Sequence, residues 1–272
     1  MRRESFEQIR SLIRQRASIV LEEGKEYLVE TRLKPVARAQ GLQDVDQLCD
    51  RLDRGRNRAL ADLVVDAMTT NETSFFRDAV PFDVMLDVVL PEVMRHNAAS
   101  KTLRIWSAAC STGQEPYSVA MLIADHFPAL AEWDVQILAS DLSQSVLLRA
   151  ERGEYRQVEV NRGLSAPQLM RHFERRGMVW RLHHRLRARV SFQQLNLTEA
   201  WSGLPTFDIV LLRNVLIYFD VADKDAVLRR MVGQIRPDGF LFLGGSESPP
   251  SGNQWQRVEV PRSGCYRRVE AF

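Results

Sequence analysis

The chain has few cysteines and no long apolar run, and each shortage excludes a class of protein. Its 272 residues contain three cysteines, Cys49, Cys110 and Cys265, which lie far apart and form no Cys-x-x-Cys pair. This spacing neither frames disulfides nor binds zinc, so we expect no metal site and a reducing compartment. No run of about 18 apolar residues occurs, which excludes a membrane-spanning helix. The charged N-terminal stretch lacks the apolar core of a signal peptide, so we expect a cytoplasmic protein without membrane insertion.

Internal repeats and low-complexity tracts are also missing, and the composition is that of a globular protein. The formal net charge of +2 decides little, but its distribution is uneven. Between Arg149 and Arg189, eleven arginines oppose four glutamates, which gives this region a charge of +7. Such a region favours an anionic partner, and the plain alternative is a solvated basic face.

The first quarter of the chain has helical periodicity. Phe6, Ile9 and Ile13 recur at helical spacing, so residues 4–69 are expected to be all-helical. Further helices are expected at 27–40, 45–52 and 60–68. Pro35 interrupts the second helix, which predicts a kink there or a new helix start near Lys34.

Residues 69–77 form a polar junction that contains an abrupt Phe75-Phe76 pair. A plain linker would not need two phenylalanines, so we expect both rings to be packed. That packing would hold Asn71, Thr73 and Arg77 in fixed positions.

From residue 81 onward, expected helices and strands alternate, which predicts a mostly parallel sheet with right-handed crossovers. The expected strands are 103–108, 134–139, 189–195, 208–212, 240–243 and 264–269. The expected helices are 81–94, 115–126, 143–152 and 222–235. Residues 237–239, Pro-Asp-Gly, are expected to form a turn. Residues 153–190 break the rhythm, with a helix expected at 165–176 and short strands within 178–189.

Polar residues follow the expected strands where ligands bind in open α/β sheets, just beyond the carboxyl ends. Asp141 is placed to accept hydrogen bonds from both ribose hydroxyls of a nucleoside, and the plain alternative is a helix N-cap. The loop 109–113 has a single glycine, which argues against a pyrophosphate and favours S-adenosylmethionine. Glu115 could hold the cationic amino-acid part of that ligand, although a glutamate also suits any helix N-terminus. Arg213 and Asn214 follow the apolar strand 208–212.

Three long motifs carry a resemblance to a known family. They are TNETSFFR at 70–77, WSAACSTGQEPYS at 106–118 and RNVLIYF at 213–219. With the helical N-terminal part, they resemble the CheR family of chemotaxis receptor methyltransferases. The resemblance implies an α/β fold: a Rossmann-like S-adenosylmethionine-dependent methyltransferase sheet with a small all-α N-terminal domain and a small antiparallel β subdomain. The domains would be 1–69 for receptor docking, a linker 70–80 that contributes to the site, and 81–272, with the subdomain at about 153–190.

The same resemblance implies an activity. The enzyme would transfer a methyl group from S-adenosylmethionine to glutamate side chains of chemoreceptors, leaving S-adenosylhomocysteine and glutamyl methyl esters. Arg77 and Tyr218 would lie nearest the reacting groups. The methyl donor would contact Asn71, Thr73, Arg77, Glu115, Asp141, Asn196, Leu197, Arg213 and Asn214. Arg32, Lys34 and Arg38 would dock the cytoplasmic helices of the receptor.

Segment 175–180 lacks the longer glycine-containing loop of pentapeptide-binding members, so we expect no pentapeptide tether. A monomer is expected. Two other functions remain open. One is a methyltransferase that acts on RNA or a small acid, which the basic region favours, although no RNA-binding motif or aromatic platform is present beyond Trp180. The other is a non-catalytic module that binds S-adenosylmethionine for signalling.

Overall fold

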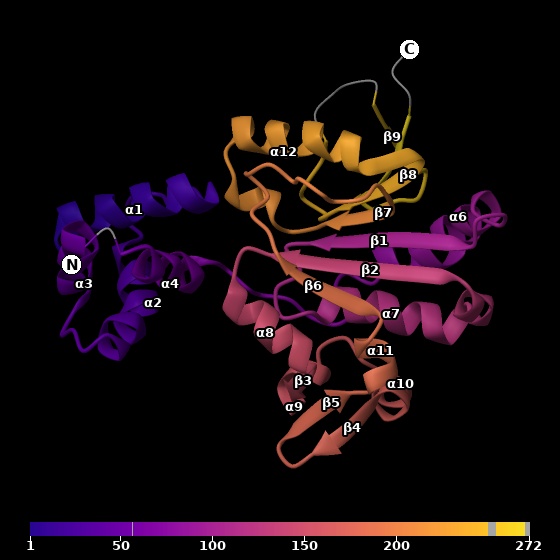
Figure 1. Cartoon of the computed structure of the whole chain (residues 1–272), viewed down its shortest axis with the longest axis horizontal. Coiled ribbons are helices and arrows are strands. Elements are labelled where there is room, and N and C mark those ends of the chain that lie inside the picture. Colours follow the sequence, from indigo (N-terminus) through magenta and orange to yellow (C-terminus); the bar gives the residue numbers. More distant parts are fainter. Residues whose placement is uncertain (56, 250–253, 270–272) are drawn as a thin grey trace. The chain divides into compact units, whose positions relative to one another are not determined.

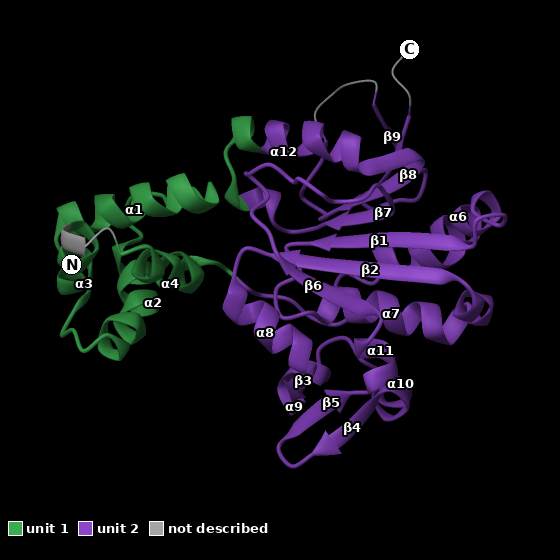
Figure 2. Ribbon diagram, in the orientation of Figure 1, with its two compact units in different colours: residues 1–70, 218–223 green, residues 71–217, 224–272 purple. Residues whose placement is uncertain are grey.

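The computed structural model describes residues 1–55, 57–249 and 254–269 (Figure 1). The chain divides into two compact units (Figure 2). A helical unit comprises residues 1–70 and 218–223, and an α/β unit comprises residues 71–217 and 224–272. None of the helices in the described ranges has the length and apolar character needed to cross a membrane.

The helical unit is built from four amphipathic helices. They are α1 (Arg3–Ala17), α2 (Glu26–Ala39), α3 (Val45–Gly55) and α4 (Arg58–Met68). Each has residues at helical spacing that are buried together, such as Phe6, Ile9 and Ile13 on α1. The helical periodicity of residues 4–69 therefore predicts these four helices correctly.

Helix α2 continues through Pro35, so the predicted helix start near Lys34 is wrong. Proline removes one backbone hydrogen bond and normally destabilises a helix interior. Here Leu33 and Ala37, on either side of Pro35, are fully buried, whereas Pro35 itself faces solvent. We infer that packing of the buried face outweighs the lost hydrogen bond.

The α/β unit contains a sheet of seven strands within the described residues, in the order β6-β2-β1-β7-β8-β10-β9. The strands are β1 (Thr102–Ala108), β2 (Asp134–Asp141), β6 (Val190–Gln194), β7 (Phe207–Leu212), β8 (Ile235–Leu243), β9 (Trp255–Arg257) and β10 (Cys265–Arg268). The first five in spatial order are parallel, and β10 and β9 add antiparallel pairs. The strand order reverses between β1 and β7, so their carboxyl ends form the switch point at which such sheets bind ligands.

The helices of this unit follow the predicted alternation with one irregularity. They include α7 (Gln114–His126), η2 (Pro128–Glu132), α8 (Gln144–Arg152) and α12 (Val221–Gln234). The single helix predicted at 81–94 is instead α5 (Val80–Val84), a π-helical turn η1 (Met85–Val89) and α6 (Leu90–His96). Pro91 lies two positions after the end of the π-helical turn and has no N–H for the usual bond to the preceding turn.

Residues 154–187 form the small inserted subdomain. Its three-stranded antiparallel sheet has the order β3-β5-β4, with β3 (Glu154–Arg156), β4 (Phe173–Arg176) and β5 (Val179–Leu182). Short helices α9 (Gln157–Val160), α10 (Ala166–His172) and α11 (His184–Arg187) accompany it. The predicted small antiparallel sheet is therefore present.

Two details of that prediction are wrong. The helix expected at 165–176 ends at His172, because Phe173 turns into strand β4 and is buried against Phe75 and Tyr155. The region 178–189 contains one strand and the helical turn α11 instead of several strands.

The C-terminal part of the large sheet also differs from the prediction. The Pro237–Gly239 turn lies inside β8 as an irregularity, because Phe207 pairs with Ile235 while Ile209 pairs with Phe240. Strand β9, which the sequence did not indicate, pairs with β10.

Gly163 holds the inserted subdomain close to the segment that precedes the sheet. A Cβ at Gly163 would lie 1.7 Å from the carbonyl oxygen of Phe75, whereas a Cβ at Gly177 would have no neighbour within 4 Å. Both glycines have positive φ, 98° and 60°. Alanine at either position is therefore strained by about 1–2 kcal/mol, and only Gly163→Ala adds a steric clash.

We predict that Gly163→Ala lowers the free energy of unfolding by about 3 kcal/mol or more, and Gly177→Ala by about 1–2 kcal/mol. Urea denaturation of both variants measures the difference. Equal losses would show that the contact between Gly163 and Phe75 does not contribute to stability.

Candidate functional site

The loop that follows β1 is made of small residues in unusual backbone conformations. Ala109, Ser111 and Gly113 have φ of 58°, 51° and 89°. The N–H of Cys110 donates to the carbonyl of Ser140 at 2.9 Å, which joins the loop to the end of β2. Non-glycine residues with positive φ persist only where the surrounding structure fixes them, and they concentrate at functional sites.

Asp141 organises this loop from the end of β2. Its carboxylate accepts hydrogen bonds from the N–H of Ser111 at 2.8 Å and from the N–H of Ser143 at 3.0 Å. The N-cap of α8 is Ser143, whose hydroxyl accepts from the N–H of Val146, so the plain alternative for Asp141 is wrong. An ionised carboxylate can accept from more than two donors, so these bonds are compatible with a ligand's hydroxyl groups.

Glu115 and Arg213 form a buried ion pair at the switch point. Nη1 of Arg213, at the end of β7, lies 2.9 Å from Oε2 of Glu115, in the first turn of α7. The Arg213 side chain is 2% exposed and that of Glu115 12%. The hydroxyl of Ser107 donates to the other carboxylate oxygen of Glu115 at 2.8 Å. Glu115 therefore accepts from two protein groups and keeps further acceptor positions for a cation.

Arg213 also fixes the segment that carries Arg77. Its Nη2 donates to the carbonyl of Arg77 at 2.8 Å and to Oδ2 of Asp78 at 2.9 Å. Asp78 has a φ of 68°, and its neighbours Phe76 and Ala79 also have positive φ. This bent segment positions the side chain of Arg77, which donates to the carbonyl of Glu72 at 2.9 Å.

The two phenylalanines of the junction are packed as predicted. Phe75 is fully buried. The centroid of its ring lies 5.0 Å from that of Tyr155 and 5.6 Å from that of Phe173. The ring of Phe76 contacts that of Phe82 at 5.2 Å. The hydroxyl of Ser111 donates to the carbonyl of Asn71 at 2.9 Å, so the junction meets the loop after β1. Asn71, Arg77, Glu115, Asp141 and Arg213 are thus joined in one network.

Other predicted residues lie at neighbouring positions. Asn214, with φ of 57°, follows Arg213. Asn196 follows β6, and its side chain bonds to Thr198 and Glu199. Leu197 is buried beside it. Thr73 is half-buried within the junction.

Tyr218 groups with the helical unit and not with this network. It ends the 3-10 turn η3 (Leu216–Tyr218), is half-buried, and its carbonyl accepts from the N–H of Val20 at 3.0 Å. Arg14 of α1 pairs with both Asp220 and Asp223, which fixes the same segment.

The three cations of α2 have different surroundings. The guanidinium of Arg32 donates to the carbonyls of Met68 and Thr69 and to the hydroxyl of Thr70. Lys34 pairs with Glu30 at 3.2 Å. Arg38 is exposed, and among the described residues its side chain has no hydrogen bond or ion pair. Arg32 therefore holds the helical unit together, while Arg38 is available for a partner.

Glu247 joins two loops beside the switch point, and its position is not predicted from the sequence. It is 9% exposed, and its carboxylate accepts from the N–H groups of Asn214 at 2.8 Å, Gly244 at 2.7 Å and Ile217 at 3.2 Å. These bonds fix the loop after β7 against the loop after β8. An acid shortly beyond the apolar end of a parallel strand was the available signal, as it was at Asp141.

Cys110 lies in the loop after β1 but is not suited to act as a nucleophile. Burial raises the pKa of its thiol well above the usual value, with smaller contributions from Asp141 and Glu115. The thiol therefore stays protonated at neutral pH, whereas the thiolate is the reactive form.

Comparison with known families places both parts of the chain. Residues 4–69 match the CheR methyltransferase all-alpha domain, and residues 71–263 match the CheR methyltransferase SAM binding domain. Together these matches confirm the predicted family, the fold class, the cofactor S-adenosylmethionine and the methyltransferase activity.

Named relatives are similar along most of their length. Chemotaxis protein methyltransferase 1 of Pseudomonas aeruginosa is 44% identical over 248 residues, covering 89% of each chain. Chemotaxis protein methyltransferase Cher2 of Pseudomonas putida is 42% identical over 248 residues, which are 89% of this chain and 90% of the relative. Chemotaxis protein methyltransferase of Escherichia coli is 38% identical over 250 residues, which are 89% of this chain and 84% of the relative.

We predict that Glu247→Gln weakens binding of S-adenosylhomocysteine and lowers stability by about 1.5–3 kcal/mol. The amide nitrogen would face N–H donors where a charged acceptor stood, leaving buried N–H groups unpaired. Calorimetric titration and urea denaturation measure the two effects. Exposed Glu259 is the matched control, and Glu259→Gln should change neither quantity. A Glu247→Gln variant that behaves like this control would show that Glu247 does not support donor binding.

Proposed function

Because this chain belongs to the CheR methyltransferase family, we propose that it methylates glutamate side chains of chemoreceptors, forming the methyl esters used in chemotaxis adaptation. The observation that carries the proposal is the network at the β1–β7 switch point. In a chain that matches both CheR domains, it gathers Asp141, Glu115 and Arg213 beside the segment of Arg77.

The side chains gathered at the switch point suit S-adenosylmethionine. Asp141 offers a buried carboxylate for the ribose hydroxyls, and Glu115 offers one for the cationic amino group. The loop 109–113 presents small side chains and backbone groups beside them. We assign the remaining donor contacts to Asn71, Thr73, Arg77, Asn196, Leu197, Arg213 and Asn214.

When bound, S-adenosylmethionine supplies a methyl group already activated by its sulfonium centre. A glutamate carboxylate is ionised at neutral pH, since its reference pKa is about 4.3, so the attacking oxygen needs no general base. The residues of the chain then orient the two groups in line and exclude water. Arg77 steers the incoming carboxylate. The second role at the reacting groups, which the RNVLIYF motif implies, is assigned to Tyr218 on that motif alone.

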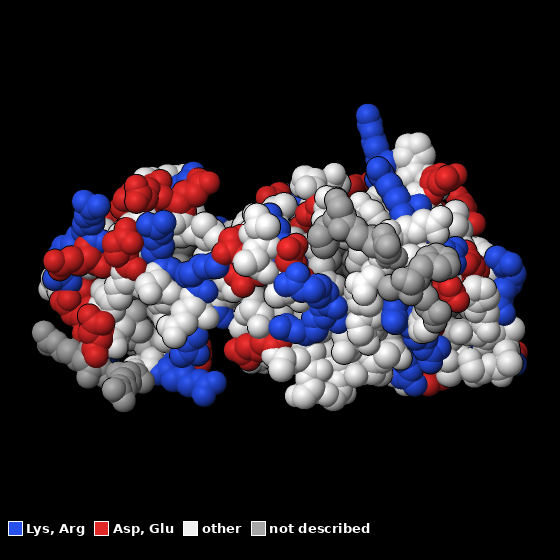
Figure 3. All heavy atoms as spheres, turned by 90° about the horizontal axis from the view of Figure 1, so that it is seen from above, with Lys and Arg blue, Asp and Glu red and all other residues white. Residues whose placement is uncertain are grey.

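Docking of the receptor is assigned to the helical unit. Arg38 is its available cation on α2, with Lys34 one turn earlier, and both would meet acidic receptor helices. In Figure 3 acidic and basic side chains alternate over the visible face of this unit, so attraction would act through local pairs. Arg32 contributes indirectly, by holding α2 to the end of α4.

A receptor pentapeptide tether is not part of the proposal. The loop between β4 and β5 consists of Gly177 and Met178 alone, because Arg176 pairs directly with Val179. A monomer in the cytoplasm, without nucleic acid, completes the proposal.

The proposal is tested by incubating the protein with radiolabelled S-adenosylmethionine and receptor cytoplasmic fragments. Label that is released by mild alkali, and absent from fragments with Glu-to-Ala changes, is expected. Carboxyl methyl esters hydrolyse under these conditions, whereas N-methyl groups do not. Alkali-stable label on RNA would support the RNA alternative. Donor binding without transfer to any substrate would support the non-catalytic signalling module.

We predict that Arg77→Ala reduces turnover about 10- to 100-fold while the dissociation constant of S-adenosylhomocysteine changes less than about threefold, because misplacing a reacting group mainly slows the chemical step. Steady-state kinetics and calorimetry measure the two. The exposed Arg95 of α6 is the control, and Arg95→Ala should preserve both values. Equal losses in turnover and donor affinity would make Arg77 a binding residue only.

We predict that Arg38→Glu raises the apparent KM for receptor about fivefold or more, and that salt raises the KM of the wild type in the same way. Screening shortens the Debye length from about 10 Å at 0.1 M to about 3 Å at 1 M. Donor affinity should be nearly constant. The control is Arg3→Glu, an equal charge change at an exposed position on α1. If Arg3→Glu raises KM as much as Arg38→Glu, docking does not depend on α2.

A further inference from the structure

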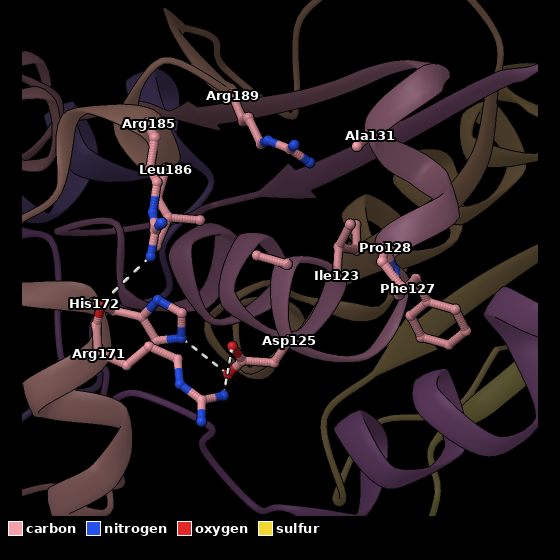
Figure 4. A pocket seen from close by; sticks show the side chains of 11 residues that line it. Ile123, Asp125, Phe127, Pro128, Ala131, Arg171, His172, Arg185, Leu186 and Arg189 are labelled. Atoms are coloured by element: carbon pink, nitrogen blue, oxygen red, sulfur yellow. Dashed lines mark hydrogen bonds and ion pairs between the residues drawn. The ribbon is translucent and has the colours of Figure 1, made fainter.

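The α/β unit contains a cavity of about 390 Å³ that lies outside the network described above. It is bounded by the C-terminal end of α7, by η2, and by α10 and α11 of the inserted subdomain. Figure 4 shows Arg171, His172 and Arg185 on one side, Phe127 and Pro128 on the other, and Arg189 between them. The network that includes Glu115 lies at the opposite, N-terminal end of α7. The 13 residues of this helix separate the two places by about 20 Å.

Positive charge in this cavity is only partly balanced. Nη1 of Arg171 lies 3.1 Å from Oδ1 of Asp125, which is the single acidic residue of the lining. Arg185 donates to the carbonyl of Arg171, and the side chain of Arg189 has no hydrogen bond or ion pair within the described ranges. Not counting His172, three guanidinium groups and one carboxylate leave a formal charge of +2.

Part of the basic region outside the cavity is paired with carboxylates. Five of its arginines pair with glutamates outside the cavity: Arg149 and Arg156 with Glu159, Arg162 with Glu72, Arg176 with Glu174, and Arg181 with Glu154. Arg152, Arg175 and Arg187 have no carboxylate partner among the described residues, so compensation outside the cavity is also partial. The cavity differs because its three guanidinium groups line one space.

His172 adds a buried polar atom that has no hydrogen-bond partner within the described part of the chain. Its side chain is fully buried, and Nε2 lies 2.9 Å from Oδ2 of Asp125. Burial raises the pKa of Asp125, but hydrogen bonds from His172 and Arg171 outweigh it and lower that pKa below its usual value. Asp125 is thus ionised, so Nε2 is the donor. Nδ1 then carries a lone pair that is buried without a hydrogen bond among the described residues, and a ligand relieves this by donating a hydrogen bond or a proton to that atom.

We propose that this cavity is a second ligand site, which binds a small phosphate monoester. A phosphate monoester carries a charge of about −1.5 to −2 at neutral pH, which matches the lining, and its oxygens suit guanidinium groups. A single carboxylate would leave one positive charge uncompensated.

The walls indicate where the two parts of such a ligand lie. Arg171, His172 and Arg185 form the end that takes the phosphate, with Arg189 reaching in from above in the view of Figure 4. Ile123, Phe127 and Pro128 form an apolar wall for the organic part. The C-terminal end of α7 has the negative end of a helix dipole, so the arginines, not the helix, attract the anion.

The test uses calorimetry on the full chain with three probes: phenyl phosphate, inorganic phosphate and phenylacetate. We expect phenyl phosphate to bind with a Kd of about 1 mM or tighter. Inorganic phosphate should bind more weakly, because it leaves the apolar wall uncovered, and phenylacetate should bind weakest. Phenylacetate binding as tightly as phenyl phosphate would overturn the proposal in favour of a carboxylate site, and absence of phenyl phosphate binding would overturn it altogether.

Variants locate the site. Arg185→Glu with Arg189→Glu should weaken phenyl phosphate binding about 100-fold, because each guanidinium removed takes away a charge-assisted hydrogen bond that contributes roughly tenfold to affinity. Arg95→Glu with Arg257→Glu makes the same charge change at exposed positions on α6 and β9 and should have little effect. Equal weakening in both variants would show general attraction to a basic protein and overturn the proposal. Titration with S-adenosylhomocysteine checks that each variant retains the donor site.

A second readout needs no variant. Phenyl phosphate should shift the ¹⁵N signal of Nδ1 of His172 in the wild-type chain, because the lone pair of that atom accepts the hydrogen of the phosphate monoanion's O–H group. Saturating phenyl phosphate that leaves this signal unchanged would overturn the proposed location.

Discussion

The ion pair between Arg213 and Glu115 is the constraint on which the α/β unit's site depends. It joins the end of β7 to the first turn of α7, and the same guanidinium holds the carbonyl of Arg77 and the carboxylate of Asp78. A buried pair of this kind is weak evidence for stability, because desolvation offsets much of the attraction. Its value here is geometric, because the guanidinium group of Arg213 holds together three segments that lie far apart in sequence. They are the end of β7, the first turn of α7 and residues 77–78. Any ligand at the switch point meets a surface that this pair has already shaped.

The sequence was informative where local patterns decide the structure. Periodicity identified the helices of the first unit, and uninterrupted apolar runs such as Ile209–Leu212 identified the parallel strands. Polar residues at the carboxyl ends of strands, such as Asp141 and Arg213, are predictable because their place in the topology follows from the strand itself. The packing of Phe75 is predictable because a plain polar linker would not need two adjacent phenylalanines.

The sequence is less informative where contacts between residues far apart in the chain determine the local structure. Pro35 reads as a helix interruption, and only the burial of Leu33 and Ala37 shows why the helix continues. Phe173 ends α10 because its ring packs on Phe75, nearly one hundred positions earlier. Arg32 looked like Arg38 in sequence, yet one holds backbone carbonyls and the other faces solvent. Glu247 was missed because its partners, the N–H groups of Asn214 and Ile217, are assembled only in the fold. Charge counting located the basic region but not which arginines are paired.

The contact of Phe75 with Gly163, Tyr155 and Phe173 has a consequence for chimaeras between relatives. Residues 153–190 look like a separable module, since they interrupt an otherwise regular alternation of strands and helices. Yet the ring of Phe75, two positions before Arg77, is enclosed by that module's aromatic residues, and its carbonyl lies against the module's glycine. Exchanging the module alone would therefore change the packing around Phe75 and so the position of the junction that carries Arg77. Grafts should be expected to work only when residue 75 and its three enclosing partners come from the same parent.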